Sequence, residues 1–274
     1  MRHMNRIKTK LYYFFAGFLL LKRVMKVPEA FLTTKNLFIY FDFEREFGGH
    51  NTINSDKDLS EILNILDAYD IKTTWFTVGK VFLRYPDSIN ELVRRGHEIG
   101  SHTHAHIVPV NVPAAELKND FRKFSETASM FNIEISGFHS PNSKWSLKML
   151  NYLRDNNFRY DLIYCSKNQK PDTLLVGRKK RSKIIRLQTI GDDWKVYQKN
   201  FTEQEVFNYF RGHLSRIRNG EIAGLGFHPW VLSSDKRIMN GFKQFIYHVA
   251  LTREFSIKPA KYFADNLMTN VKKQ

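Results

Sequence analysis

The chain has 274 residues, which is enough for one large α/β domain of roughly 200–250 residues or for two small ones. Apolar residues make up 42% of it, which excludes wholesale disorder, and the single cysteine, Cys165, excludes an internal disulfide and a thiolate metal site. The formal charge of +16 favours an anionic partner, but without an RNA-binding aromatic signature or zinc-finger spacing it does not predict nucleic acid.

Residues 1–34 are predicted to be an N-terminal segment that precedes a catalytic domain at residues 35–274. Residues 11–21 are apolar apart from one glycine and have basic flanks. This run is shorter than the ~20 residues that span a bilayer, and no signal-peptide cleavage site follows it. We favour an anchor that contacts an anionic membrane surface, while a helix packed on the domain stays open. The chain is accordingly expected to be cytoplasmic or membrane-associated.

From residue 37 onward, strand and helix patterns alternate along the chain. Strands are predicted at residues 37–43, 73–78, 98–101, 135–139, 160–165 and 222–227. Helices are predicted at residues 56–66, 86–95, 113–131, 145–156, 202–219 and 238–251. Two apolar runs at residues 173–176 and 184–187 flank a basic turn and predict a hairpin excursion. Repeated βα units predict a parallel sheet closed into a barrel.

Polar side chains with catalytic potential follow these predicted strands. In β/α barrels the chemistry lies at the carboxyl ends of the strands, where the loops of successive units meet. The residues found at such positions are Asp42, Glu44, His102, His104, His106, His139, Asp192, Asp193 and His228. Their coincidence with strand ends predicts one shared site.

The sequence HTHAH at residues 102–106 predicts a metal site. His102 and His106 are four residues apart, and on a helical turn this spacing places both imidazoles on one face. A carboxylate from Asp42 or Glu44 would complete a set of two histidines and one carboxylate with open positions for water and substrate. His104 is expected to point elsewhere. The alternative is a surface loop that happens to be rich in histidine.

The positions of Asp42, Glu44 and His228 predict proton transfer beside this metal. Asp42 and Glu44 point to the same face if the strand continues between them, so one can bind the metal and the other can act as a general base. A protonated His228 can give a proton to a departing amine, and Asp192 or Asp193 could hold it charged. Alternatively, His228 is only hydrogen-bonded within a Pro-Trp turn.

Five segments together resemble the ordered motifs of the polysaccharide deacetylase family (the NodB homology domain, carbohydrate esterase family four). They are FDFE at residues 41–44, GHEIGSHTHAH at 96–106, GFHSP at 137–141, GDDW at 191–194 and GFHPW at 226–230. The second is the most specific, and the set covers about residues 35–252. The resemblance implies a deformed (β/α)7-type barrel.

The resemblance also implies the role of each site residue. Asp42 is the base, His228 is the acid, and Glu44, His102 and His106 hold a divalent metal, usually zinc, although cobalt and nickel also serve. Thr103 orients the site by hydrogen bonding, and backbone N–H groups near Ser140 stabilise the oxyanion. The motifs place substrate contacts at His139, Ser140, Pro141, Trp194 and Trp230.

Two residues depart from the family pattern. His139 replaces the usual arginine that pairs with the base, and Glu44 replaces the commoner aspartate. We expect His139 to be a neutral hydrogen-bond partner of Asp42 or a substrate contact, or to be turned away from it. The expected activity is removal of N-acetyl groups from a polysaccharide, oligosaccharide or lipid-linked glycan. The alternatives are a metal-dependent amidohydrolase acting on a small non-sugar amide and an inactive carbohydrate-binding protein.

Overall fold

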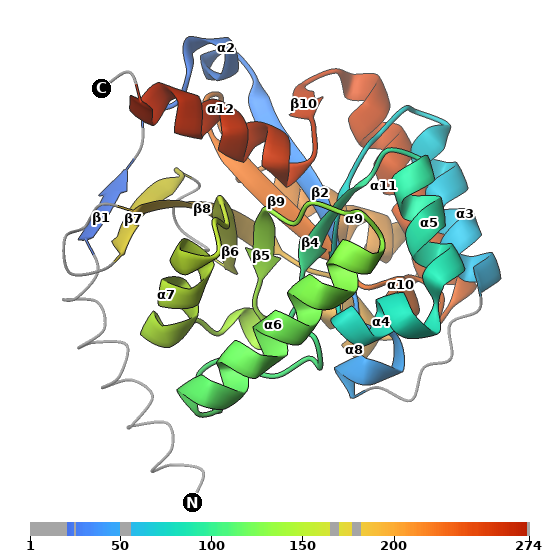
Figure 1. The fold of residues 1–274 in the computed structure, drawn as a ribbon. Helices are drawn as coiled ribbons and strands as arrows, with labels where there is room; N and C mark the ends of the chain where they lie inside the picture. The colour runs from blue at the N-terminus through green and yellow to red at the C-terminus, as the bar shows by residue number, and fades with distance from the viewer. Residues whose placement is uncertain (1–20, 25, 50–55, 165–169, 177–181, 273–274) are drawn as a thin grey trace, which may run out of the picture.

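A computed structural model describes residues 21–24, 26–49, 56–164, 170–176 and 182–272 (Figure 1). Seven parallel strands close into a barrel, because the last of them pairs with the first as well as with its predecessor. In order they are β2 (Lys35–Phe43), β3 (Thr74–Thr77), β4 (Glu98–Ser101), β5 (Gly137–His139), β6 (Tyr160–Tyr164), β8 (Ser182–Gly191) and β9 (Ile222–Phe227). The predicted deformed (β/α)7-type barrel is confirmed.

Three further strands extend the sheet outside the barrel. The predicted hairpin is present, since β7 (Asp172–Val176) runs antiparallel to β8. Its second arm is not an excursion, however, because β8 continues to Gly191 as one of the barrel strands. Arg186, Gln188 and Thr189 interrupt the apolar pattern there, which explains why the sequence understated this strand. The other two are β1 (Leu21–Val24), which pairs with β7, and β10 (Phe255–Ile257), which pairs with β2.

Helices cover the outside of the barrel (Figure 1). The long ones are α3 (Asp56–Asp67), α5 (Pro86–Arg94), α6 (Ala114–Met130), α7 (Leu147–Asp155), α9 (Glu203–Leu214) and α11 (Lys236–Thr252). The sequence predicts their bounds within a few residues, except that α9 ends at Leu214 and not at residue 219. The sequence did not predict α2 (Glu29–Leu32), α4 (Gly79–Arg84), α8 (Trp194–Gln198), α10 (Pro229–Leu232) or α12 (Ala260–Lys272). Among the described residues, none of the helices combines the length and hydropathy needed to span a bilayer.

The amino end of the barrel is closed by α12. The backbone N–H of Ala260 donates to Thr74 Oγ1 at 2.8 Å, and that of Lys261 donates to Glu98 Oε2 at 2.9 Å. Thr74 and Glu98 are the first residues of β3 and β4, so the start of α12 is fixed below the strands. The carboxyl ends of the strands are left for the functional site.

Part of the predicted N-terminal segment packs on the barrel. Phe31 of α2 is buried, and its ring lies 5.4 Å from that of Phe263 in α12. Residues 21–24 form β1. Residues 1–20 lie outside the described residues, so the membrane-anchor interpretation of residues 11–21 stays a prediction, as does the domain boundary.

Candidate active site

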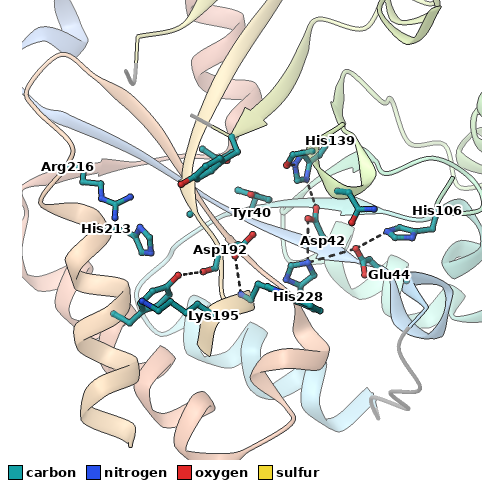
Figure 2. A pocket seen from close by; sticks show the side chains of 18 residues that line it. Tyr40, Asp42, Glu44, His106, His139, Asp192, Lys195, His213, Arg216 and His228 are labelled. Atoms are coloured by element: carbon teal, nitrogen blue, oxygen red, sulfur yellow. Dashed lines mark hydrogen bonds and ion pairs between the residues drawn. The ribbon is translucent and has the colours of Figure 1, made fainter. Parts of the chain in front are cut away.

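The polar residues at the strand ends meet in one cleft of about 590 Å³ (Figure 2). Asp42 lies in β2, Glu44 follows that strand, and His106 lies in the loop after β4. His139 ends β5 and His228 follows β9. Parallel strands present their carboxyl ends at one rim of a barrel, and this geometry assembles residues that are far apart in sequence.

Glu44, His102 and His106 converge as a metal-binding set would. Glu44 Oε1 lies 3.3 Å from His102 Nε2 and 3.1 Å from His106 Nε2. His102 Nδ1 donates to the backbone carbonyl of His139 at 2.8 Å, which fixes the ring orientation. Within the described residues, the buried Nε2 of His102 makes no hydrogen bond. A histidine anchored through one nitrogen with the other directed at a carboxylate has the geometry of a metal ligand.

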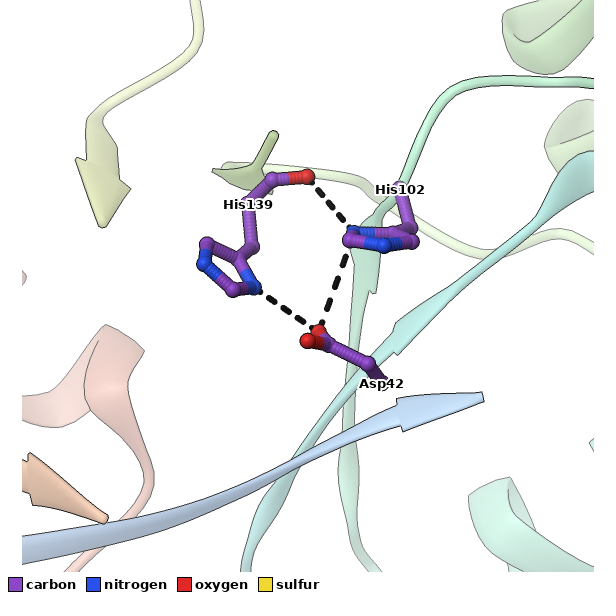
Figure 3. A group of neighbouring side chains, drawn as sticks. All are labelled: Asp42, His102 and His139. Carbon is purple, nitrogen blue, oxygen red and sulfur yellow. Dashed lines mark hydrogen bonds and ion pairs between the residues drawn. The ribbon is translucent and has the colours of Figure 1, made fainter. Parts of the chain in front are cut away.

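Asp42, His102 and His139 form a second, overlapping cluster (Figure 3). His102 Nδ1 lies 3.7 Å from Asp42 Oδ1, but it already donates to the His139 carbonyl and is therefore not free to bind a cation. His139 Nδ1 donates to Asp42 Oδ1 at 2.8 Å. These contacts make Asp42 a hydrogen-bonded carboxylate beside Glu44, and the two acids also converge with His228 as a third candidate group.

The loop that carries His102 and His106 is not the helical turn expected from their spacing. Residues 102–106 are irregular, and Thr103 and His106 both have left-handed backbone angles, with φ of +66° and +56°. Asp120 of α6 accepts the backbone N–H of His104 at 2.7 Å and that of Ala105 at 2.9 Å. The two imidazoles therefore converge because the loop follows β4 and is held in shape by its hydrogen bonds to Asp120. The sequence analysis missed Asp120, which lies in the middle of a helix.

Thr103 and His104 lie around this loop without entering the metal-binding set. Thr103 is buried, and its Oγ1 accepts the backbone N–H of Ile107 at 3.1 Å. The His104 ring packs against Gly79, where an added Cβ would lie 2.5 Å from His104 Nδ1. His104 therefore points away from Glu44, as expected.

Asp42 is held ionised in a buried position. Burial raises the pKa of this carboxyl, but His139 and His102 outweigh burial and hold the pKa below its usual value. His139 faces Asp42 and is not turned away, and its Nε2 lies 3.2 Å from Ser143 Oγ. Tyr40, which the sequence analysis did not single out, lines the cleft nearby, and burial raises its pKa well above 10.

His228 is paired with Asp193. Its Nδ1 donates to Asp193 Oδ1 at 2.6 Å, and its backbone N–H donates to Asp193 Oδ2 at 2.7 Å. Asp193 is wholly buried, whereas Asp192 is exposed and accepts the backbone N–H of Trp194. Burial lowers the pKa of His228, but the Asp193 carboxylate overcomes burial and raises it to about 10. Nε2 of this cationic imidazole lies 3.8 Å from Asp42 Oδ2.

Only some of the residues that are predicted to contact the substrate line the cleft. His139 and Trp194 line the cleft. Trp230 is 1% exposed and packs against Tyr197 with ring centroids 4.8 Å apart. Ser140 and Pro141 are also buried, and neither is among the side chains that line the cleft. Their predicted contacts with substrate, and the oxyanion donors near Ser140, stay predictions.

Comparisons with known proteins relate part of this chain to one family. The family model for polysaccharide deacetylase matches residues 37–160. A peptidoglycan-N-acetylglucosamine deacetylase from Bacillus cereus is 33% identical over 69 residues, which cover 24% of this chain and 32% of that relative. This chain therefore matches about a third of the relative's length.

Solved structures share the fold over most of the chain. A candidate polysaccharide deacetylase from Mycobacterium smegmatis has a TM-score of 0.77 at 18% identity, over 92% of this chain and 96% of that one. An allantoinase has a TM-score of 0.69 at 15% identity, over 85% and 90%. A pseudoenzyme of carbohydrate esterase family four from Bacillus anthracis has a TM-score of 0.59 at 13% identity, over 86% and 67%. At these identities the likeness shows the fold alone.

Proposed function

From the match of residues 37–160 to the polysaccharide deacetylase family model, we propose that this chain is a member of that family and a metal-dependent hydrolase that removes N-acetyl groups from an N-acetylated glycan. The glycan is a polysaccharide, an oligosaccharide or a lipid-linked sugar. The observation that supports the proposal most is the placement of an ionised carboxylate, Asp42, and a cationic imidazole, His228, beside three converging metal-type donors. General base, general acid and electrophile are thereby within reach of one amide.

The donor set fits a divalent cation. Two imidazole nitrogens and one carboxylate oxygen are ligands that zinc accepts with a position left open, and cobalt and nickel take the same donors. Bound by Glu44, His102 and His106, such an ion would polarise the acetamide carbonyl and lower the pKa of an attacking water. The buried Nε2 of His102 supports a cation there, since it faces Glu44 Oε1 at 3.3 Å and makes no hydrogen bond among the described residues.

The protein's own residues then move two protons. Asp42, held ionised by His139 and His102, accepts a proton from the water that attacks the acetamide carbon. His228, held protonated by Asp193, donates a proton to the nitrogen as the C–N bond breaks. The products are acetate and a free amine on the sugar. Each proton transfer is expected to contribute roughly 10²–10⁴-fold to the rate.

A mass-spectrometric screen of N-acetylated glycans and lipid-linked sugars tests the proposal. Loss of an acetyl group together with a new amine is the expected result. Turnover of a small cyclic amide without release of acetate from any glycan would favour the amidohydrolase alternative. Binding of a glycan by the metal-loaded protein with no acetate released would favour the inactive carbohydrate-binding protein.

Replacing Asp193 by asparagine is expected to move the alkaline limb of the pH–rate profile to lower pH. The Asp193 carboxylate is the main cause that raises the pKa of His228 to about 10, and without it only Glu44 and Asp42 oppose the burial that lowers this pKa. Because the acid must be protonated, activity is lost as pH rises through its pKa, so the loss begins earlier in the variant. The measurement is kcat/KM against pH. Asp192→Asn is the matched control, and an equal displacement in both variants would contradict the pairing.

Replacing His139 tests whether it tunes Asp42. In His139→Ala the side chain that lowers the pKa of Asp42 is lost, so the acidic limb should move to higher pH. In His139→Arg a permanent charge faces Asp42, and the limb should stay in place or move to lower pH. Full pH–rate profiles of both variants distinguish these outcomes. Profiles that overlay that of the parent would show that His139 has no role in the base.

A further inference from the structure

The cleft extends beyond His228 into a region opposite the metal-binding set. Figure 2 shows Lys195, His213 and Arg216 on the side of the cleft away from His106. We call these three residues the basic subsite. Aromatic side chains surround it, namely Tyr164, Trp194 and Tyr209. None of the proton-transfer steps described above uses this half of the cleft.

His213 is buried at the inner wall of the basic subsite, where the backbone carbonyl of Ile190 acts on its ring in the direction that raises its pKa. It is only 6% exposed, and within the described part of the chain neither of its ring nitrogens makes a hydrogen bond. Its ring is fixed between Tyr209, with centroids 4.8 Å apart, and Gly191, where an added Cβ would lie 2.3 Å from His213 Cε1. Burial, with help from Arg216, lowers the pKa of His213 to about 4, so the ring is neutral at pH 7. An imidazole without a strong protein partner at the wall of a cleft can hydrogen-bond a ligand once the ring turns toward it.

The two cations of the basic subsite share the cleft with the acid Asp192 and form no ion pair with it. Among the described residues, neither Lys195 nor Arg216 is within ion-pair distance of a carboxylate. Arg216 Nη1 donates to the backbone carbonyl of Ile190 at 3.2 Å, which leaves its other donors free. Lys195 Nζ lies 5.6 Å from the centroid of the Tyr209 ring. The nearby acid Asp192 has one carboxylate oxygen bonded to the backbone of Trp194.

We propose that Lys195, His213 and Arg216 bind an anionic group of the substrate, a carboxylate or a phosphate, on the sugar next to the one that is deacetylated. A guanidinium matches both groups with two parallel N–H donors, and the lysine adds charge. The neutral His213 adds an N–H donor, and the aromatic side chains offer flat surfaces to a sugar ring. This inference rests on the proposed function and narrows its substrate class to acidic glycans.

Matched substrates test the inference through turnover. One pair compares an N-acetylglucosamine unit joined to glucuronate with the same unit joined to glucose. The other compares the same unit joined to glucose 6-phosphate with the unit joined to glucose. The protein should prefer the anionic member of at least one pair, and Arg216→Gln or Lys195→Gln should reduce that preference by roughly 10-fold or more. The substrate pair with the larger preference shows whether the basic subsite binds a carboxylate or a phosphate. Arg211→Gln is the control, since Arg211 lies over Phe207 and outside the cleft.

A binding measurement separates this inference from the proposed function. Ligand-observed NMR with glucuronate, glucose 1-phosphate and glucose needs no turnover. An anion that binds the parent but not Arg216→Gln supports the basic subsite even if no acetate is ever released. The inference is overturned if neither anion binds better than glucose and neither pair shows a preference. It is also overturned if binding is lost in His102→Ala but kept in Arg216→Gln, because the anion would then lie at the metal ligands.

Discussion

Asp42→Asn is expected to lower kcat by roughly 10²–10⁴-fold while the protein keeps its fold and its metal. Asparagine preserves the volume of the side chain and can still contact His139, but it cannot accept a proton from water. Asp42 is buried and its pKa is held below the usual value, so the ionised form is the one present at neutral pH. Steady-state acetate release by the parent and the variant measures the effect.

Metal content is the control for this variant. Because we assign Glu44, and not Asp42, to the metal, elemental analysis should give the same metal-to-protein ratio in both proteins. Near-normal turnover in Asp42→Asn would refute its role as the base. Loss of the metal together with activity would instead make Asp42 a ligand.

Replacing His102 or His106 by alanine is expected to remove most of the bound metal and therefore most of the activity. The parent, purified without chelator, should carry close to one equivalent of a divalent ion held by Glu44, His102 and His106. His102→Ala and His106→Ala each leave two of the three donors, and three protein ligands are the usual minimum for catalytic zinc. Elemental analysis and reactivation by added zinc, cobalt or nickel measure the loss.

His104→Ala is the matched control, since this histidine lies in the same loop and packs against Gly79 instead of Glu44. It should keep the metal. Unchanged metal content in His102→Ala and His106→Ala would show that these side chains do not hold the ion. An equal loss in all three variants would indicate that the loop has collapsed, and the assignment of ligands would then lack support.

The sequence predicts the barrel and the positions of the site residues because both depend on local patterns. Short apolar runs that alternate with helical patterns place Asp42, His139 and His228 at strand ends, and the barrel brings strand ends together. The sequence could not predict whether Asp192 or Asp193 pairs with His228. The choice depends on the tertiary contact in which Asp193 is buried against His228 while Asp192 stays exposed.

Features that depend on tertiary contacts were missed or misjudged. The HTHAH spacing suggested a helical turn, but the loop is shaped by Asp120, which is distant in sequence. Lys195 and Arg216 are two of 43 basic residues, and no local pattern distinguishes them from solvated surface charges. The structure sets them apart by placing them beside the buried His213 in one cleft.

The most direct test of the account is the stoichiometry of acetate release from an N-acetylated glycan by the zinc-loaded protein. Acetate and new amine groups should appear in equal amounts, the reaction should stop when a chelator is added and resume when zinc is restored, and Asp42→Asn should release acetate roughly 10²–10⁴-fold more slowly. Release that continues at full rate in Asp42→Asn or in the metal-free protein would contradict the account. So would the absence of acetate from neutral, carboxylated and phosphorylated glycans alike when the metal site is full.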